Sequence, residues 1–215
     1  PLVDSLLSVR YALCSEYIPN TDLVNYIQES GGTYLYENLY TLPLGFVLPY
    51  DLADNWQYQM ENPAEVQNDL CLLLGTDDVL VPVETEVSGS GCTFTADMAG
   101  EYYVYIQNKK VKNVKASLPS GEKNFSNVDR GYLLEMGNLS EGSRITLTPG
   151  ESGETLTAAV YRFSPRAMIQ VYDRLSQSPL HLDDWRDTKL TGTVTAAESG
   201  TLFLSIPYDE GWTIT

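Results

Sequence analysis

The 215-residue chain is 43% hydrophobic and 20% charged, a composition that favours a folded protein over a disordered one. Its formal net charge of −16, from 29 acidic and 13 basic residues, argues against binding to nucleic acid or anionic lipid, because both need clustered Lys and Arg. With three cysteines, one histidine and no CxxC motif, the sequence argues against a metal or other cofactor. The odd number of cysteines argues against a disulfide framework. No apolar run is long enough to span a membrane.

The first 60 residues mix helical and extended patterns. Asn20 and Thr21 are typical N-cap residues, and Gly31-Gly32 is a typical helix end, so a short helix is expected between them. The elements predicted in this segment are a helical turn at 2–7, a strand at 9–13, the short helix through Ile27, and strands at 33–38 and 45–49.

The clearest helix is predicted at residues 62–74, within a connecting segment of residues 61–78. Asn62 is the N-cap, Pro63 occupies the first helical position, and Glu65 places negative charge in the first turn. Gly75 ends the helix.

Short alternating runs broken by Gly, Asn and Ser follow over residues 79–163. Their spacing predicts a mainly β fold in which this segment forms a β-sandwich or jelly roll. The predicted strands are 79–87, 91–97, 100–107, 111–117, 131–136, 143–148 and 155–163. The run from Lys109 to Lys115 is interpreted as a lysine-protected edge strand, with a patch for an anionic polymer as the alternative.

The last 50 residues return to a mixed pattern. Met168, Ile169, Tyr172 and Leu175 have helical spacing, so residues 165–186 are expected to be largely helical, with strands at 188–196 and 200–207. Segments 1–60 and 166–215 each have too few strands to bury a sheet face, and we expect them to pair as one smaller, discontinuous α+β unit.

Residues 93–106 are echoed by residues 193–206, each a strand, a small acidic turn with Gly, and an apolar strand. An internal repeat and a chance likeness between hairpins both remain open. Residues 200–215 alternate without a closing turn. We therefore expect the chain to be a piece of a longer protein, cut at Thr215.

Four stretches in order along the chain carry a resemblance to a known family. They are LLSVRY at 6–11, YLYENLYTLP at 34–43, DTKLTGTV at 187–194 and LSIPYDEGW at 204–212. Together they resemble the YfhO family of bacterial polytopic membrane proteins. The chain departs from that pattern at Leu44 and Gly45, where some members have a basic residue, and it lacks the strands that follow the Gly-Trp.

The resemblance implies a segment on the extracytoplasmic face of the bacterial membrane, attached to the remainder of the parent membrane protein. It also implies a parent that is similar to lipid-linked-sugar glycosyltransferases and decorates cell-envelope polymers. The catalytic carboxylates of such enzymes belong to loops near the membrane, so no catalytic residue is carried over to this chain. A stand-alone carbohydrate-binding β-sandwich is the alternative function.

Catalytic chemistry has little support in the residues themselves. His181 is the only histidine and no nucleophile elbow accompanies it, which disfavours a hydrolase. Asp183-Asp184 is expected to charge the start of a helical turn rather than form an acid/base pair. We therefore expect neither a catalytic nor a metal site in this chain. The resemblance implies an envelope glycan or polymer as the partner.

Aromatic side chains are the candidates for sugar contact, because their faces pack against the apolar faces of sugar rings. Trp56 and Tyr58 lie in a polar stretch, and Trp185 follows a pair of acidic residues. These three are the predicted carbohydrate-binding residues, whereas Trp212 is expected to pack internally.

Overall fold

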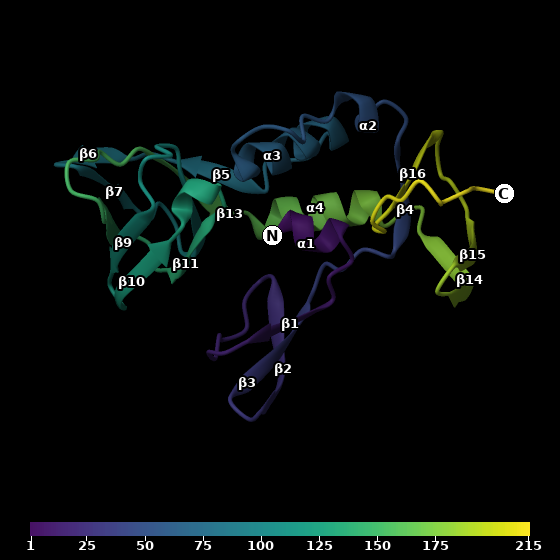
Figure 1. Ribbon diagram of the computed structural model, residues 1–215, viewed down its shortest axis with the longest axis horizontal. Coiled ribbons are helices and arrows are strands. Elements are labelled where there is room, and N and C mark those ends of the chain that lie inside the picture. The colour runs from purple at the N-terminus through teal and green to yellow at the C-terminus, as the bar shows by residue number, and fades with distance from the viewer. The chain divides into compact units, whose positions relative to one another are not determined.

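The computed structural model describes residues 1–215 and divides the chain into two units (Figure 1). The composite unit comprises Pro1–Trp56, Leu73–Asp77 and Pro165–Thr215, and the sandwich unit comprises Gln57–Leu72 and Asp78–Ser164. Both units are built on antiparallel sheets, which confirms the predicted mainly β fold class. None of the helices combines the length and the apolar composition that a membrane crossing requires.

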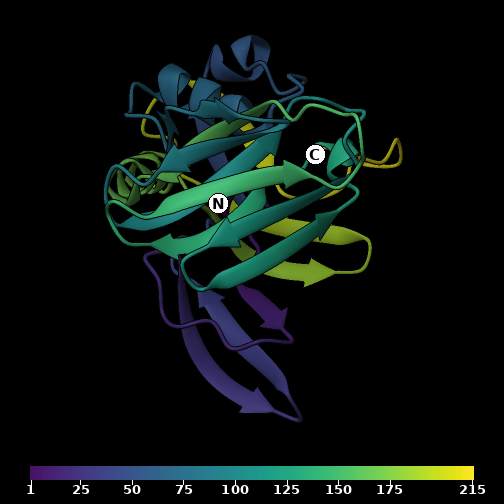
Figure 2. The same cartoon turned by 90° about the vertical axis from the view of Figure 1, so that its left-hand side faces the viewer.

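Two sheets form the sandwich unit, and their strands are seen as broad arrows in Figure 2. The five-stranded sheet has the order β10 (Gly121–Ser126), β9 (Asn113–Leu118), β12 (Arg144–Pro149), β7 (Gly91–Thr95) and β6 (Glu86–Ser88). The four-stranded sheet has the order β11 (Leu134–Leu139), β8 (Gly100–Ile106), β13 (Ala158–Phe163) and β5 (Leu80–Val83). The predicted sandwich is therefore confirmed.

The core of the sandwich unit lies between these sheets. Strand β9 shows the underlying pattern, because its buried and exposed residues alternate strictly and so one face points inward. The inward side chains of both sheets form one buried cluster, which includes Phe94, Tyr102, Val104 and Ile145.

Helix α3 (Pro63–Leu74) begins with the predicted cap. The Oδ1 atom of Asn62 accepts the backbone N–H of Ala64 at 3.0 Å, and Gly75 follows the helix with φ +70°. Asn68 exchanges two hydrogen bonds with the backbone of Leu80, at 2.7 and 3.0 Å. These bonds satisfy part of the outer edge of β5, which would otherwise be open.

One strand of the sandwich unit was not expected from the sequence. Strand β10 is almost entirely exposed and polar, so it lacks the alternation that predicts strands. Strand β9 pairs with β10 on one side and with β12 on the other, so it is not an edge strand. Residues 109–112 precede β9 and are not part of a strand. The interpretation of Lys109–Lys115 as an edge strand was therefore wrong.

The composite unit contains three small sheets and three helices. Its elements are α1 (Leu2–Leu6), β1 (Tyr11–Cys14), β2 (Val24–Ser30), β3 (Thr33–Asn38), β4 (Gly45–Pro49), α2 (Leu52–Asn55), α4 (Pro165–Leu175), β14 (Leu180–Arg186), β15 (Lys189–Val194) and β16 (Gly200–Leu204). The sheets have the orders β1-β3-β2, β14-β15 and β16-β4.

The helix predicted to end at Ile27 is instead strand β2. The Thr21 hydroxyl accepts the N–H groups of Leu23 and Val24, which forms a turn rather than a helix start. Gly31 and Gly32 have φ +59° and +77°, the left-handed conformations that a two-residue hairpin turn requires. The residues that resemble helix signals thus form the turns at both ends of β2.

The predicted helix of residues 165–186 is also shorter than expected. Helix α4 ends at Leu175, and Asp183, Asp184 and Trp185 lie in strand β14 rather than in a helical turn. Trp185 pairs across the hairpin with Leu190, so cross-strand pairing outweighs the local capping signal there. Strand β16 ends at Leu204, and residues 205–215 carry no further strand.

Candidate functional site

A polar pocket of about 340 Å³ lies beside the N-terminus of α3 in the sandwich unit. Its volume is within the range of about 300–1,000 Å³ that is usual for small-molecule sites. The segment before the helix supplies Met60, Glu61 and Asn62, and the helix supplies Glu65. The remaining lining residues, Tyr105 and Gln107, lie at the end of β8 and directly after it.

Hydrogen bonds hold the inner residues of this pocket in place. Asn62 Nδ2 donates to the Tyr161 hydroxyl at 2.6 Å and to Glu65 Oε1 at 3.2 Å. Lys109 Nζ donates to the Tyr105 hydroxyl at 2.8 Å and lies 4.6 Å from the centroid of its ring. Asn62 and Tyr105 are buried, whereas Glu61, Glu65 and Gln107 are exposed at the rim.

The rim residues are suited to polar ligands without negative charge. The two carboxylates can accept hydrogen bonds from sugar hydroxyl groups, and the Gln107 amide can both donate and accept. Burial raises the pKa of Tyr161, and the nearby Glu65 carboxylate adds to that rise, so this phenol stays neutral. The pocket therefore offers hydrogen-bonding groups beside the buried Tyr105.

None of the three predicted sugar-contacting aromatics is part of the pocket lining. Tyr58 is 60% exposed and precedes the pocket by two residues, but it is not part of its lining. Trp56 is half-buried at the C-cap of α2 in the composite unit. Trp185 is 72% exposed on β14 and makes no ring contact with another aromatic residue. Trp212, which was expected to pack internally, is 45% exposed.

The titratable residues considered for catalysis all lie on one strand of the composite unit. His181, Asp183 and Asp184 are exposed on β14, where the bulge between Leu182 and Asp184 breaks the register with β15. No group of three His, Cys, Asp or Glu side chains is placed to hold a metal ion.

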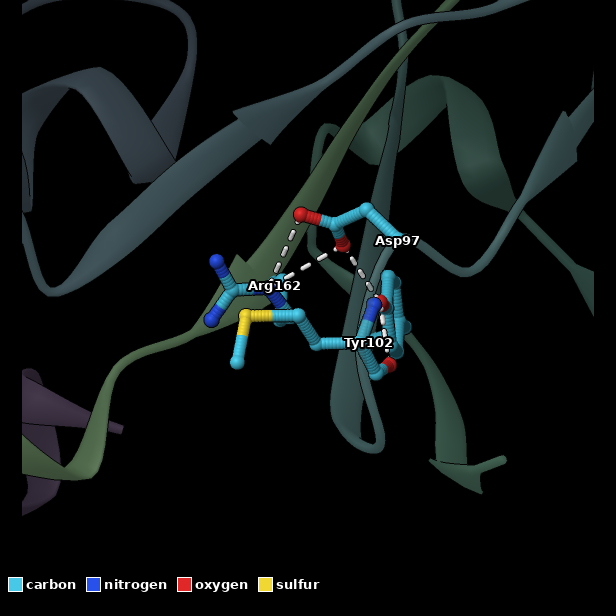
Figure 3. A network of polar contacts seen from close by, with 4 residues as sticks. Asp97, Tyr102 and Arg162 are labelled. Carbon is cyan, nitrogen blue, oxygen red and sulfur yellow. Dashed lines mark hydrogen bonds and ion pairs between the residues drawn. The ribbon is translucent and has the colours of Figure 1, made fainter. Parts of the chain in front are cut away.

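Figure 3 shows a network of polar contacts at the other end of β8 that joins the two sheets of the sandwich unit. The Tyr102 hydroxyl has two acceptors for its hydrogen, Asp97 Oδ1 at 2.6 Å and the Met98 carbonyl at 2.8 Å. Arg162 Nε donates to both Asp97 oxygens, at 3.1 and 3.3 Å. The network therefore fixes the turn through which the chain passes from β7 in one sheet to β8 in the other.

The network changes the acidity of both its titratable members. Burial acts to raise the pKa of Asp97, but the hydrogen bonds from Tyr102 and Arg162 and the positive charge of Arg162 outweigh it, and the net pKa lies below the ordinary 3.8. Burial, together with the hydrogen bond to Asp97, raises the pKa of Tyr102 to about 12. Asp97 also lines a second pocket, of about 400 Å³, with exposed Glu84 and Glu86.

Sequence reasoning found Tyr58 near the first pocket but missed the pocket itself. Its walls come from two segments about 45 residues apart, around residues 60–65 and 105–107. The sequence signal that could have pointed to this pocket is the capping pair of Asn62 and Glu65. Asn62 caps α3 and donates to Glu65, and both residues also line the pocket.

Comparison with known proteins adds one finding. The family model described as bacterial membrane protein YfhO matches residues 76–215, which include most of the sandwich unit and the C-terminal part of the composite unit. Neither a curated protein nor a solved structure is significantly similar to the chain. Because the family model matches well over half of the chain, this protein belongs to the YfhO family of bacterial membrane proteins.

Proposed function

We propose that this chain is a non-catalytic, extracytoplasmic part of a YfhO-family membrane protein that supports glycosylation of a cell-envelope polymer. Its role is to hold a glycan while the membrane-embedded part of such a protein acts on it. The observation that carries the proposal is the polar pocket beside α3, because carboxylate and amide side chains line it together with the buried Tyr105.

The charge of the pocket narrows the class of sugar. Glu61 and Glu65 at the rim disfavour an anionic ligand, and Lys109 is already engaged with Tyr105. The net charge of −16 also repels anionic polymer backbones at long range. The pocket is therefore suited to a neutral or amino sugar, such as a substituent that the polymer carries, rather than to an acidic backbone.

A glycan array that contains neutral, amino and acidic sugars tests this proposal. We expect the chain to retain neutral or amino sugars without turnover. The double variant Glu61→Gln/Gln107→Ala exchanges one rim carboxylate for a neutral amide and removes the Gln107 amide. It should weaken binding about tenfold, which corresponds to about 1.4 kcal/mol. Glu141→Gln, a charge-matched change at an exposed position in the turn between β11 and β12, is the control.

Two results would contradict the proposal. One is a wild-type chain that binds no glycan on the array, and the other is a double variant that binds as tightly as Glu141→Gln. Hydrolysis or transfer of a bound glycan by the purified chain would contradict the non-catalytic role.

The same pocket favours a second candidate, a carbohydrate-binding module that acts without a membrane partner. Glycan binding is expected under both readings, so a genetic experiment separates them. Removal of this segment from the gene should abolish decoration of the envelope polymer under the first reading and leave it unchanged under the second.

A further inference from the structure

Two stretches of the chain share one pattern at a constant spacing of 100 residues. Residues 79–107, the first copy, align without a gap with residues 179–207, the second copy. The identical pairs are Leu80 and Leu180, Thr93 and Thr193, Thr95 and Thr195, Ala96 and Ala196, Gly100 and Gly200, and Ile106 and Ile206. Five of these pairs lie within the echo between 93–106 and 193–206, and Leu80 with Leu180 is the one identical pair before it.

The structure gives both copies a similar order of elements, although the hairpin turn lies at 89–90 in the first copy and at 187–188 in the second. In the first copy, hairpin β6–β7 leads through a turn into β8, which pairs with β13. In the second copy, hairpin β14–β15 leads through a turn into β16, which pairs with β4. The strand after the turn begins at a glycine in each copy, and that strand joins a different sheet from the hairpin.

The strand pairing agrees in a further detail. Tyr103 lies opposite Tyr161 in the first copy, and Phe203 lies opposite Phe46 in the second. Each turn also has an acidic residue paired with an arginine, but these pairs are not equivalent: Asp97 pairs with Arg162 of β13 at 3.1 Å, whereas Glu198, one position later in the alignment, pairs with Arg174 of α4 at 2.6 Å. The second copy therefore repeats, in the composite unit, the order of hairpin, turn and strand of the first copy.

The two copies differ in their neighbours. In the sandwich unit, β7 has a second partner in β12 and β8 has a second partner in β11. In the composite unit, β15 pairs only with β14, and β16 pairs only with β4. The edges that correspond to those covered by β12 and β11 are open, so their N–H and C=O groups lack strand partners.

The side chains between these edges differ in the same way. In the first copy, Phe94, Tyr102 and Val104 face the core and are no more than 2% exposed. Their counterparts in the second copy are Val194, Leu202 and Leu204, which are 37%, 41% and 37% exposed. The face that forms the core of the sandwich unit is thus uncovered in the composite unit.

We propose that the open face of β15 and β16 binds an extended polypeptide that adds antiparallel strands to both edges, in the places that β12 and β11 occupy in the sandwich unit. The occupant is a segment of β structure with apolar residues at alternate positions, as in β12, where Ile145 and Leu147 are buried and their neighbours are not. With these added strands, the hairpin β14–β15 and strand β16 would have the same neighbours as their counterparts in the sandwich unit.

The first copy shows why the occupant is polypeptide. The open edges offer rows of backbone donors and acceptors at strand spacing, and a second extended backbone satisfies them in register. A glycan or a lipid covers apolar side chains without matching these rows. The proposal goes beyond glycan binding and does not depend on it, because the polar pocket belongs to the sandwich unit.

Cysteine labelling in the membrane tests the proposal. In a Cys14→Ser background, Leu204→Cys places a thiol on the open face, and Thr188→Cys places one in the exposed β14–β15 turn as a matched control. In the dilute purified 215-residue chain, we expect both thiols to react rapidly with a maleimide. In the gene product within its own membrane, the Leu204→Cys thiol should react at least tenfold more slowly, and the control should not change.

A photo-crosslinker identifies what covers the face. With p-benzoylphenylalanine in place of Leu202, mass spectrometry should find an adduct with a peptide whose apolar residues alternate. Equal labelling of Leu204→Cys in the membrane and in the purified chain would overturn the proposal. An adduct with the same hairpin of a second copy, with lipid or with glycan would overturn it as well. A chain that binds no glycan on the array would still be expected to show slow labelling and the peptide adduct. The glycan proposal and the strand-addition proposal therefore fail separately.

Discussion

The Asp97–Tyr102–Arg162 network predicts a measurable loss of stability when one hydroxyl group is removed. Tyr102→Phe keeps the ring, which is 0% exposed and stacks on Phe94 with the centroids 5.9 Å apart, so the buried apolar area is nearly unchanged. The variant loses the 2.6 Å hydrogen bond to the Asp97 carboxylate. Hydrogen bonds to charged groups contribute about 1.5–3 kcal/mol. Because the Asp97 side chain is 47% exposed and water can replace the lost donor, we expect about 1–2 kcal/mol.

A matched control isolates the role of the carboxylate. Tyr132 is 41% exposed, and its hydroxyl donates to the Ser126 carbonyl at 2.7 Å, so Tyr132→Phe removes a hydroxyl with a neutral acceptor. We expect this control to lose less than about 0.5 kcal/mol. The contrast between the two variants measures what the part-buried, charge-assisted bond contributes.

The assay must follow the sandwich unit specifically. All three tryptophans lie in the composite unit, so tryptophan fluorescence does not report on the sandwich. Hydrogen exchange at β7 and β8 as a function of urea gives the free energy of opening at the network itself. If Tyr102→Phe and Tyr132→Phe destabilise these strands equally, the network does not hold the β7–β8 turn and the reasoning is wrong.

Further predictions concern acidity, thiols and a turn. Because the folded-state pKa of Asp97 is lowered, its contribution is present above the ordinary carboxyl pKa and is lost as pH falls through the lowered value. The stability difference between wild type and Arg162→Gln should therefore shrink between pH 5 and about pH 3, as acid unfolding curves would reveal. Burial raises the pKa of Cys92 to about 11. A thiol reagent at pH 8 should therefore modify half-buried Cys14 and leave Cys92 unmodified. Rapid reaction of Cys92 would contradict its buried position in the sandwich. Gly31→Ala places an L-residue at φ +59°, which is strained even though no atom lies within 4 Å of the added Cβ. The variant should lose about 1–2 kcal/mol of stability and show faster hydrogen exchange across β2 and β3. Unchanged exchange would exclude the observed turn.

The sequence by itself was sufficient for the elements whose signals are local. Helix α3 was predicted because Asn62, Pro63 and Gly75 mark its two ends, and the structure has the same cap and the same glycine. Strands β3 and β4 were predicted at the residues where they occur, and the alternation over residues 79–163 predicted the sandwich. Family membership was also visible in the sequence, through ordered stretches that need no tertiary contact to recognise.

Pairing between distant strands determined the elements and the site that have no local signal in the sequence. Strand β2 has signals typical of a helix start, and β10 has no apolar alternation, yet each is extended because a neighbouring strand satisfies its backbone. The polar pocket brings residues 60–65 to residues 105–107, and the bond from Arg162 to Asp97 joins positions 65 residues apart. Side chains that meet only after the sheets have paired leave no periodicity in the sequence, so the candidate site could be recognised only in the folded chain.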